Sequence, residues 1–132
     1  MKEQPELSKG EMEIARLLWQ LGEATVRQVH EAVPEGRDID FATVQTYLRR
    51  LEAKGYAKTR LEGRTRVYSP RVKPNAVIRR TVDGLVDRLF GGDALPLLRH
   101  LIEDRGMGEK EIAELRRMLD KLEREAADDS NR

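Results

Sequence analysis

The sequence predicts a mainly α-helical fold with one small β-hairpin. Apolar residues recur at helical spacing in six segments, and this period changes to alternation only between residues 56 and 69. Glycine or proline stands at most of the breaks between segments. Over residues 1–73 the order is helix, helix, helix, hairpin, which is typical of a winged helix-turn-helix. We expect residues 74–132 to form a separate region of three further helices.

Each of the first three helices is expected to begin after a side chain that can accept backbone N–H bonds. These N-cap residues are Ser8, with Glu11 completing a capping box, Thr25 and Asp40. The helices should end where a glycine or proline interrupts the apolar pattern. These breaks are Gly22, Pro34–Gly36 and Gly55, which places the third helix between Asp40 and about Lys54.

The hairpin is predicted from two short alternating segments that begin after Gly55 and end at Pro70, with a turn around Gly63. Two strands alone are only marginally stable, so this hairpin must pack against the helices. Beyond it, we expect a helix from Pro74 to Phe90, one that Asp93 caps, and one from about Glu109 to Ala126.

Composition restricts the class of protein. With 132 residues and 39% hydrophobic residues, the chain can bury one modest core. It has no cysteine, which excludes disulfides and thiolate metal sites. No apolar run approaches the ~18 residues that a bilayer requires, and the first residues lack the pattern of a signal peptide. We therefore expect a cytoplasmic protein without membrane insertion.

The positive charge is concentrated in the third helix and the hairpin. Residues 37–73 contain ten Lys/Arg and four Asp/Glu, a net charge of +6, although the whole chain carries only +1. Residues 1–36 and 74–132 carry −3 and −2. Such a local basic surface is typical of a protein that contacts nucleic-acid phosphates.

The third helix has the side chains of a DNA-recognition helix. Val44, Tyr47, Leu48 and Leu51 should face the core, which leaves small, amide and guanidinium side chains exposed. Such groups can read base edges, and the basic hairpin that follows can contact phosphates. The predicted DNA-binding residues are Ala42, Thr43, Gln45, Thr46, Arg49, Arg50, Lys54, Lys58, Arg60, Arg64 and Arg66. The alternative is that the arginines of the helix are simply solvated.

The helices beyond Pro74 carry apolar stripes that are too wide for three short helices to cover by themselves. A symmetric dimer would bury them and supply two reading heads for a palindromic operator. The predicted interface residues are Val82, Leu85, Val86, Leu89, Phe90, Leu98, Leu101, Ile102, Ile112, Leu115, Leu119 and Leu122. The alternative is a monomer in which these helices pack back onto the winged domain.

No pattern indicates an enzyme, a metal site or a cofactor. The sequence lacks a glycine-rich phosphate loop, a nucleophile elbow and paired carboxylates in a recognisable setting. His30 is expected on the solvated side of the second helix. His100 has no acidic or histidine partner at ligand spacing.

Three segments resemble the penicillinase repressor (BlaI/MecI-type) family of bacterial regulators. They are LSKGEMEIARLLWQLGEATVRQVHEAV, TVQTYLRRLEAKGYAKTRLEGRTRVYSP, and DRLFGGD followed by EIAELRRMLDKLE. The resemblance implies a homodimeric winged-helix repressor that occupies double-stranded operator DNA and blocks transcription. It also implies that Thr43, Thr46 and Arg50 lie at recognition positions, and that Arg64 and Arg66 lie in the wing.

The resemblance further implies how the repressor is released, as part of an antibiotic response. A membrane sensor protease triggers cleavage of such regulators within the dimerisation region, at an Asn-Phe pair in some members. The corresponding position in this chain is His100-Leu101.

The sequence therefore predicts a sequence-specific transcriptional repressor. One alternative is a winged helix that serves as a protein–protein interaction module, since the fold alone does not imply DNA binding. The basic hairpin disfavours this alternative, because the cores of protein interfaces are depleted in charge. The other alternative is a ligand-sensing regulator. It is disfavoured because we expect no polar groups to converge on the stripes of residues 77–90 and 95–102.

Overall fold

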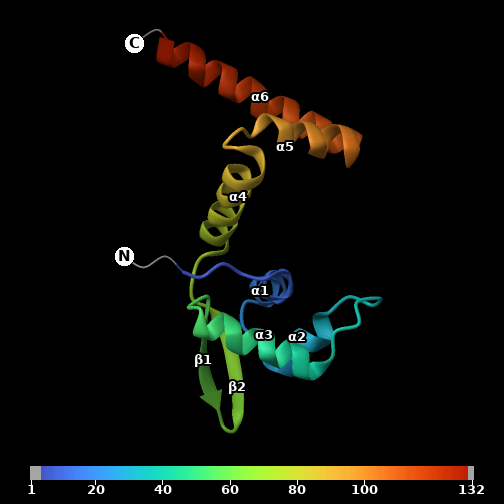
Figure 1. Cartoon of the computed structure of the whole chain (residues 1–132), viewed down its shortest axis with the longest axis vertical. Helices are drawn as coiled ribbons and strands as arrows, with labels where there is room; N and C mark the ends of the chain where they lie inside the picture. The colour runs from blue at the N-terminus through green and yellow to red at the C-terminus, as the bar shows by residue number, and fades with distance from the viewer. Residues whose placement is uncertain (1–3, 131–132) are drawn as a thin grey trace. The chain divides into compact units, whose positions relative to one another are not determined.

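The computed structural model describes residues 4–130 and divides into two compact units, the first ending at Val82 and the second beginning at Asp83 (Figure 1). The first unit consists of α1 (Lys9–Leu21), α2 (Val26–Ala32), α3 (Phe41–Ala53), β1 (Ala57–Glu62), β2 (Thr65–Pro70) and the first turns of α4 (Pro74–Phe90). The second unit contains the rest of α4, α5 (Leu95–Arg99), the π-helical segment η1 (His100–Asp104) and α6 (Glu109–Ser130). The predicted fold class, mainly helical with one hairpin, is confirmed.

The predicted N-caps begin the first three helices. The backbone N–H of Glu11 donates to Ser8 Oγ at 3.2 Å, and the N–H of Ser8 donates to Glu11 Oε1 at 2.9 Å. Thr25 forms a similar reciprocal pair with Gln28. Asp40 Oδ1 accepts the N–H of Thr43 at 2.8 Å, and hydrogen bonding from the side chain and backbone of Thr43 lowers the pKa of Asp40. Local hydrogen bonds of this kind fix where each helix starts.

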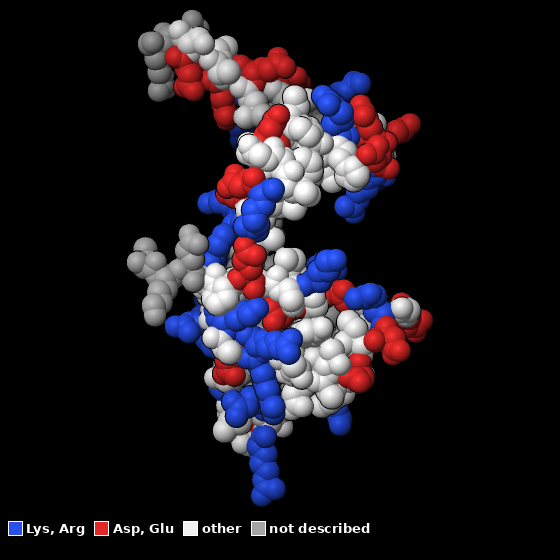
Figure 2. Space-filling view, in the orientation of Figure 1, with Lys and Arg blue, Asp and Glu red and all other residues white. Residues whose placement is uncertain are grey.

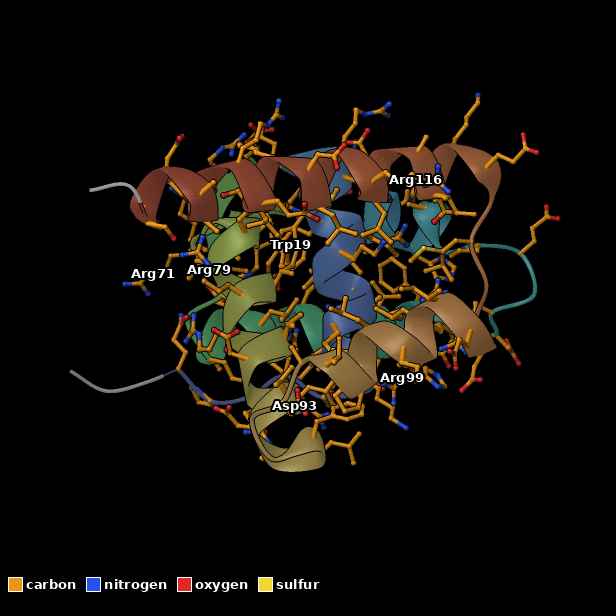
Figure 3. The ribbon with its side chains drawn as sticks, turned by 90° about the horizontal axis from the view of Figure 1, so that it is seen from above. Trp19, Arg71, Arg79, Asp93, Arg99 and Arg116 are labelled. Atoms are coloured by element: carbon orange, nitrogen blue, oxygen red, sulfur yellow. The ribbon has the colours of Figure 1, made fainter. Side chains whose placement is uncertain are left out.

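A single core lies among α1, α2, α3 and the hairpin and also takes in the base of α4. Its fully buried side chains include Ile14, Leu18, Val29, Val44, Leu48, Leu51 and Tyr68. Trp19 packs against this core and stays partly exposed (Figure 3). Tyr47 is also partly buried against it. Val77 of α4 belongs to the same core, at 4% exposure. The first turns of α4 therefore pack with the winged unit.

The hairpin is anchored to the helices through its second strand. β1 and β2 pair antiparallel, with Lys58 opposite Ser69 and Arg60 opposite Val67. The buried Tyr68 also exchanges two backbone hydrogen bonds with Ala24, at 2.8 and 2.9 Å. β2 is thus the central strand and β1 the outer one, and this third partner supports a hairpin that would be marginal alone.

The second unit differs in three details from the expected helices. The helix that Asp93 is expected to cap begins at Leu95 with Ala94 at its N-cap, although Asp93 Oδ1 accepts the N–H of Leu95 at 3.1 Å. This helix changes to π-helical geometry at His100. The last helix continues to Ser130 rather than ending near Ala126, and residues 131–132 lie outside the described part of the chain. Between residues 4 and 130, no helix has the length and apolar character needed to cross a membrane.

Candidate nucleic-acid interface

α3 presents its predicted reading side chains on the surface of the winged unit. Val44, Leu48 and Leu51 are buried, and this burial turns the intervening positions outward. Ala42, Thr46, Arg49 and Arg50 are exposed, while Thr43 and Gln45 are half-buried. The hydroxyl of Thr46 donates to the carbonyl of Ala42 at 3.0 Å, so its oxygen remains free to accept and its methyl group to make apolar contacts.

Two hollows flank this helix. The larger, of about 650 Å³, lies among α2, α3 and the hairpin and is lined by Thr25, Val26, Arg27, Phe41, Gln45, Arg49, Arg64, Thr65, Arg66 and Tyr68. The smaller, of about 280 Å³, is lined by Asp40, Ala42, Thr43, Thr46, Tyr47 and Arg50. The two hollows divide the exposed residues of α3 into two rows along the helix.

The larger hollow brings together four arginines from two helices and the hairpin. Arg27 comes from α2, Arg49 from α3, Arg64 from the turn of the hairpin, and Arg66 from β2. No carboxylate lines this hollow, and none of the four arginines forms an ion pair with a residue of the described chain. Four uncompensated guanidiniums produce a strongly positive potential that attracts phosphate groups.

Arg27 was missed by the sequence prediction. It lies in α2, the helix that precedes the recognition helix, and it is exposed. In helix-turn-helix proteins the helix before the recognition helix crosses the DNA backbone. A lone arginine on the polar side of that helix was therefore the signal that could have found it.

The two faces of the hairpin are not equivalent. Thr59 donates a 2.7 Å hydrogen bond to Glu52 of α3 and receives a 3.4 Å contact from Arg66, so this face is turned toward α3. Because side chains alternate along a strand, Lys58 and Arg60 lie on the opposite face. The structure therefore separates Lys58 and Arg60 from Arg64 and Arg66, although all four were predicted as one group.

Arg60 is held by two carboxylates. Its guanidinium donates to Glu23 at 2.7 and 3.0 Å and to Glu62 at 2.6 Å. The hydrogen bonds from Arg60, together with its charge, lower the pKa of Glu23, and the same pairing raises the pKa of Arg60. To bind a phosphate, as the sequence predicted, Arg60 would have to release these partners.

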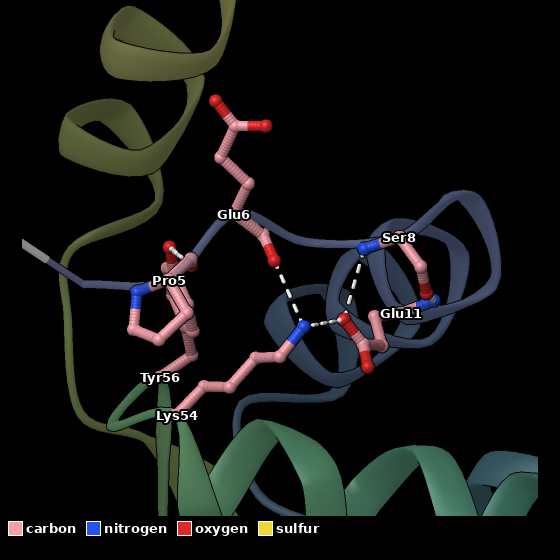
Figure 4. A network of polar contacts seen from close by, with 6 residues as sticks. All are labelled: Pro5, Glu6, Ser8, Glu11, Lys54 and Tyr56. Carbon is pink, nitrogen blue, oxygen red and sulfur yellow. Dashed lines mark hydrogen bonds and ion pairs between the residues drawn. The ribbon is translucent and has the colours of Figure 1, made fainter.

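Lys54, another predicted DNA-binding residue, is held by acceptors within the fold. Its ammonium donates to Glu11 Oε1 at 2.6 Å and to the carbonyl of Glu6 at 2.8 Å (Figure 4). Beside it, the hydroxyl of Tyr56 donates to the carbonyl of Pro5 at 2.6 Å. Lys54 is held there because the carboxylate of Glu11 is buried by the packing of α1 against α3, and a buried carboxylate requires a cation close to it.

Burial by itself raises the pKa of Glu11, whose side chain is only 2% exposed. The hydrogen bonds from Lys54 and Ser8 and the charge of Lys54 outweigh this effect, so that the pKa lies below its usual value. Glu11 is therefore ionised at neutral pH, inside the fold.

The predicted dimer-interface residues are poorly covered within one chain. No residue after Val77 is buried in the described chain. Val86, Phe90, Leu101 and Leu115 are partly covered, and the others are exposed: Val82, Leu85, Leu89, Leu98, Ile102, Ile112, Leu119 and Leu122. An exposed apolar surface of this kind is typical of an interaction site.

Two expectations about the second unit are wrong. His100 does have an acidic neighbour, since its Nδ1 lies 2.8 Å from Asp104 Oδ2. Polar groups also converge on the apolar stripes, around a hollow of about 550 Å³ lined by Leu85, Leu89, Phe90, Pro96, Leu97, Arg99, His100, Glu103 and Asp104. His100 and Asp104 are four residues apart, a spacing that places two side chains on the same face of an ordinary helix, so the sequence pattern could have shown this pair. No group of three metal-ligating side chains forms within residues 4–130.

Comparison with known proteins shows similarity to penicillinase repressors. The family model described as penicillinase repressor matches residues 7–121. The chain is 28% identical over 114 residues to an uncharacterized 16.5 kDa protein of Latilactobacillus sakei, covering 86% of this chain and 78% of that one. It is 26% identical over 120 residues to the penicillinase repressor of Bacillus licheniformis, covering 91% and 94%.

Among solved structures, a MarR family protein from Bacillus stearothermophilus aligns with a TM-score of 0.53 at 15% identity, covering 93% of this chain and 77% of that one. At this level of identity the similarity concerns the fold alone.

Proposed function

Because the chain belongs to the penicillinase repressor family, we propose that it represses transcription as a homodimer on a palindromic operator. The family consists of DNA-binding transcriptional repressors, not of enzymes. The observation that carries the proposal is the hollow beside α3, where Arg27, Arg49, Arg64 and Arg66 converge without a carboxylate next to side chains that can read bases.

We assign sequence reading to α3 and phosphate binding to the four arginines and the wing. Thr43, Gln45, Thr46 and Arg50 carry the groups that contact base edges in a major groove. Arg64, at the turn of the hairpin, is assigned to the adjacent minor groove. Phosphate contacts position the protein, and base contacts choose the sequence.

Dimerisation is assigned to the second unit. Its apolar side chains are exposed in a single chain, and two copies that covered them would each present one α3 to one half of a palindrome. The exposed residues of α4, α5, η1 and α6 listed above are the proposed interface. The assignment of DNA binding to residues 1–73 and dimerisation to residues 74–132 stays a prediction.

Release by proteolysis is assigned to His100-Leu101. These residues begin the π-helical segment, and the side chain of His100 is 61% exposed. Cleavage there would separate α6 from the DNA-binding unit and remove part of the proposed interface. The partner that triggers such cleavage would be a membrane sensor protease.

A second candidate function is ligand sensing in the second unit. The hollow of about 550 Å³ combines an apolar floor with Arg99, His100, Glu103 and Asp104, which is a composition that suits a small amphipathic molecule. A second copy of the chain would cover the same apolar residues, so ligand binding and dimerisation would compete for this surface. The protein–protein module receives no support comparable to either.

The test of the proposed function is selection of bound duplexes from random and genomic DNA, followed by salt titration. We expect a palindromic consensus, and an affinity that falls about 10³-fold between 50 and 200 mM salt if about six phosphates are contacted. Failure to enrich any sequence, together with a salt-insensitive complex with a protein, would favour the interaction module.

Removal of a base-reading side chain should relax sequence choice. Arg50→Ala and Thr46→Ala are each expected to weaken binding to the selected duplex by about 1–3 kcal/mol, and to weaken binding to random duplex much less. Competition binding of both variants against random duplex measures this difference. Arg124→Ala in α6 is the control, and undiminished discrimination by Arg50→Ala would remove that residue from the reading surface.

A further inference from the structure

A second basic groove lies on the face of the hairpin that is turned away from α3. It has a volume of about 730 Å³ and is lined by Gly22, Glu23, Lys58, Thr59, Arg60, Ser69, Pro70, Arg71, Val72, Lys73 and Pro74. Figure 2 shows Lys and Arg gathered in a band over the hairpin and the base of α4. The function proposed above assigns no role to Arg71 and Lys73 of this groove.

Three cations of the groove have no carboxylate partner among the described residues. Lys58, Arg71 and Lys73 are exposed and form no ion pair there. The acidic residue of the lining, Glu23, is neutralised by Arg60 at 2.7 Å. The groove therefore presents about three uncompensated positive charges.

The backbone holds these cations in place. The N–H of Arg71 donates to the carbonyl of Tyr56 at 2.9 Å, which closes the base of the hairpin. Pro70 and Pro74 restrict the chain on either side of Arg71 and Lys73. In Figure 3 the side chain of Arg71 extends outward from the body of the protein. The charges thus lie on a fixed edge of the winged unit rather than on a loose tail.

We propose that Lys58, Arg71 and Lys73 bind DNA phosphates outside the segment that α3 reads, on the far side of the hairpin. This inference rests on the proposed function and extends its footprint. If the hairpin turn enters a minor groove, its two faces meet the phosphates of two different strands. Arg66 would bind the phosphates on the side of α3, and the cations of the outer groove would bind those on the other side.

The same features argue against an acidic protein as the ligand of this groove. Protein interfaces have apolar cores depleted in charge, whereas four basic side chains line this groove: Lys58, Arg60, Arg71 and Lys73. A hairpin with free cations on both faces and at its turn fits between two rows of phosphates better than it fits one flat surface.

Arg60 has a different role in this proposal. Its bonds to Glu23 and Glu62 join the outer strand to the loop that precedes α2, so it positions the hairpin and contacts no phosphate. The proposal therefore distinguishes Arg60 from its neighbour Lys58 in a way that can be measured.

The experiment measures the dependence of log affinity on log salt for the full chain on its selected duplex. Each phosphate contact contributes about 0.9 to this slope. The variant Lys58→Gln/Arg71→Gln/Lys73→Gln should lower the slope by about 2 to 3 per bound protomer. Arg60→Gln should leave the slope unchanged.

A matched control removes the same charges elsewhere. Lys110→Gln/Lys121→Gln/Arg124→Gln deletes two lysines and one arginine from α6, and its slope should equal that of the wild type. Thermal unfolding checks that both triple variants fold; if the groove variant does not, Lys73→Gln alone should lower the slope by about 0.9.

The outcomes separate this inference from the proposed function. An unchanged slope in the groove variant, with duplex binding intact, overturns the inference and leaves the repressor function standing. An equal decrease in both triple variants also overturns it, because only total charge would then matter. A wild-type chain that binds no duplex would instead overturn the function itself.

Discussion

Leu119→Asp should convert the proposed dimer into a monomer and weaken binding to a full palindromic site about 10²- to 10⁴-fold. Leu119 lies on α6 and is 49% exposed in a single chain, so a carboxylate there costs the monomer little. In a dimer the same carboxylate would be buried without a partner, which is strongly unfavourable. Binding to a duplex with a single half-site should stay at the wild-type level, because the first unit is unchanged.

Sedimentation and binding to full-site and half-site duplexes test this expectation. Ala113→Asp is the matched control: it adds the same charge to the opposite side of α6, where residue 113 is exposed. If Leu119→Asp remains a dimer, the interface lies elsewhere on the second unit. If both variants dissociate, the added charge and not its position is responsible.

Lys54→Met should destabilise the first unit by about 3 kcal/mol, because removal of one member of a buried ion pair leaves the other charge without compensation. Methionine keeps the apolar stem of the side chain, so the loss reports mainly on the ammonium. That ammonium lies 2.6 Å from the buried Glu11 and also holds the carbonyl of Glu6. Urea unfolding at neutral pH measures the change.

Two further variants test whether the loss of stability comes from the uncompensated charge of Glu11. Arg37→Met removes an ion pair with Glu13 whose side chains are 57% and 37% exposed, and should cost less than about 1 kcal/mol. Glu11→Gln in the Lys54→Met background removes the uncompensated charge and should restore part of the stability. Equal effects of Lys54→Met and Arg37→Met would contradict the buried pair.

The pH dependence follows from the lowered pKa of Glu11. Because its pKa in the folded state lies below the usual value of 4.5, the unfolded chain binds the proton more tightly. The stability that this carboxylate contributes is thus fully present above that value and is lost as the pH falls through the lower folded pKa. Lys54→Met should show a weaker loss of stability over this acidic range than the wild type.

Much of the fold could be predicted from local sequence signals. The starts of α1, α2 and α3 depend on hydrogen bonds between residues three apart, as in Ser8–Glu11 and Asp40–Thr43. The hairpin follows from alternation and a glycine turn. The π-helical η1 and the last turn of α6 could not be predicted. η1 differs from an ordinary helix only in its backbone hydrogen-bond pattern, and the end of α6 is marked by no capping residue in the sequence.

Two parts of the candidate site could be predicted from the sequence: the exposed face of α3, from its helical period, and the segments that are basic. The basic segments predicted nucleic acid as the ligand. The sequence could not indicate which cations are free: Lys54 meets Glu11, 43 residues away, and Arg60 meets Glu23, 37 residues away. It also missed Arg27, which the packing of α2 against α3 brings into the same hollow as Arg49.

By itself, then, the sequence determined the order and limits of the first elements and the location of the positive charge, because both depend on neighbours a few residues apart. Only the tertiary structure decided which basic side chains face a common surface, which are neutralised, and that the hairpin has two basic faces. Ion pairs and hollows join residues that are distant in the chain, and no local pattern specifies which of them will meet.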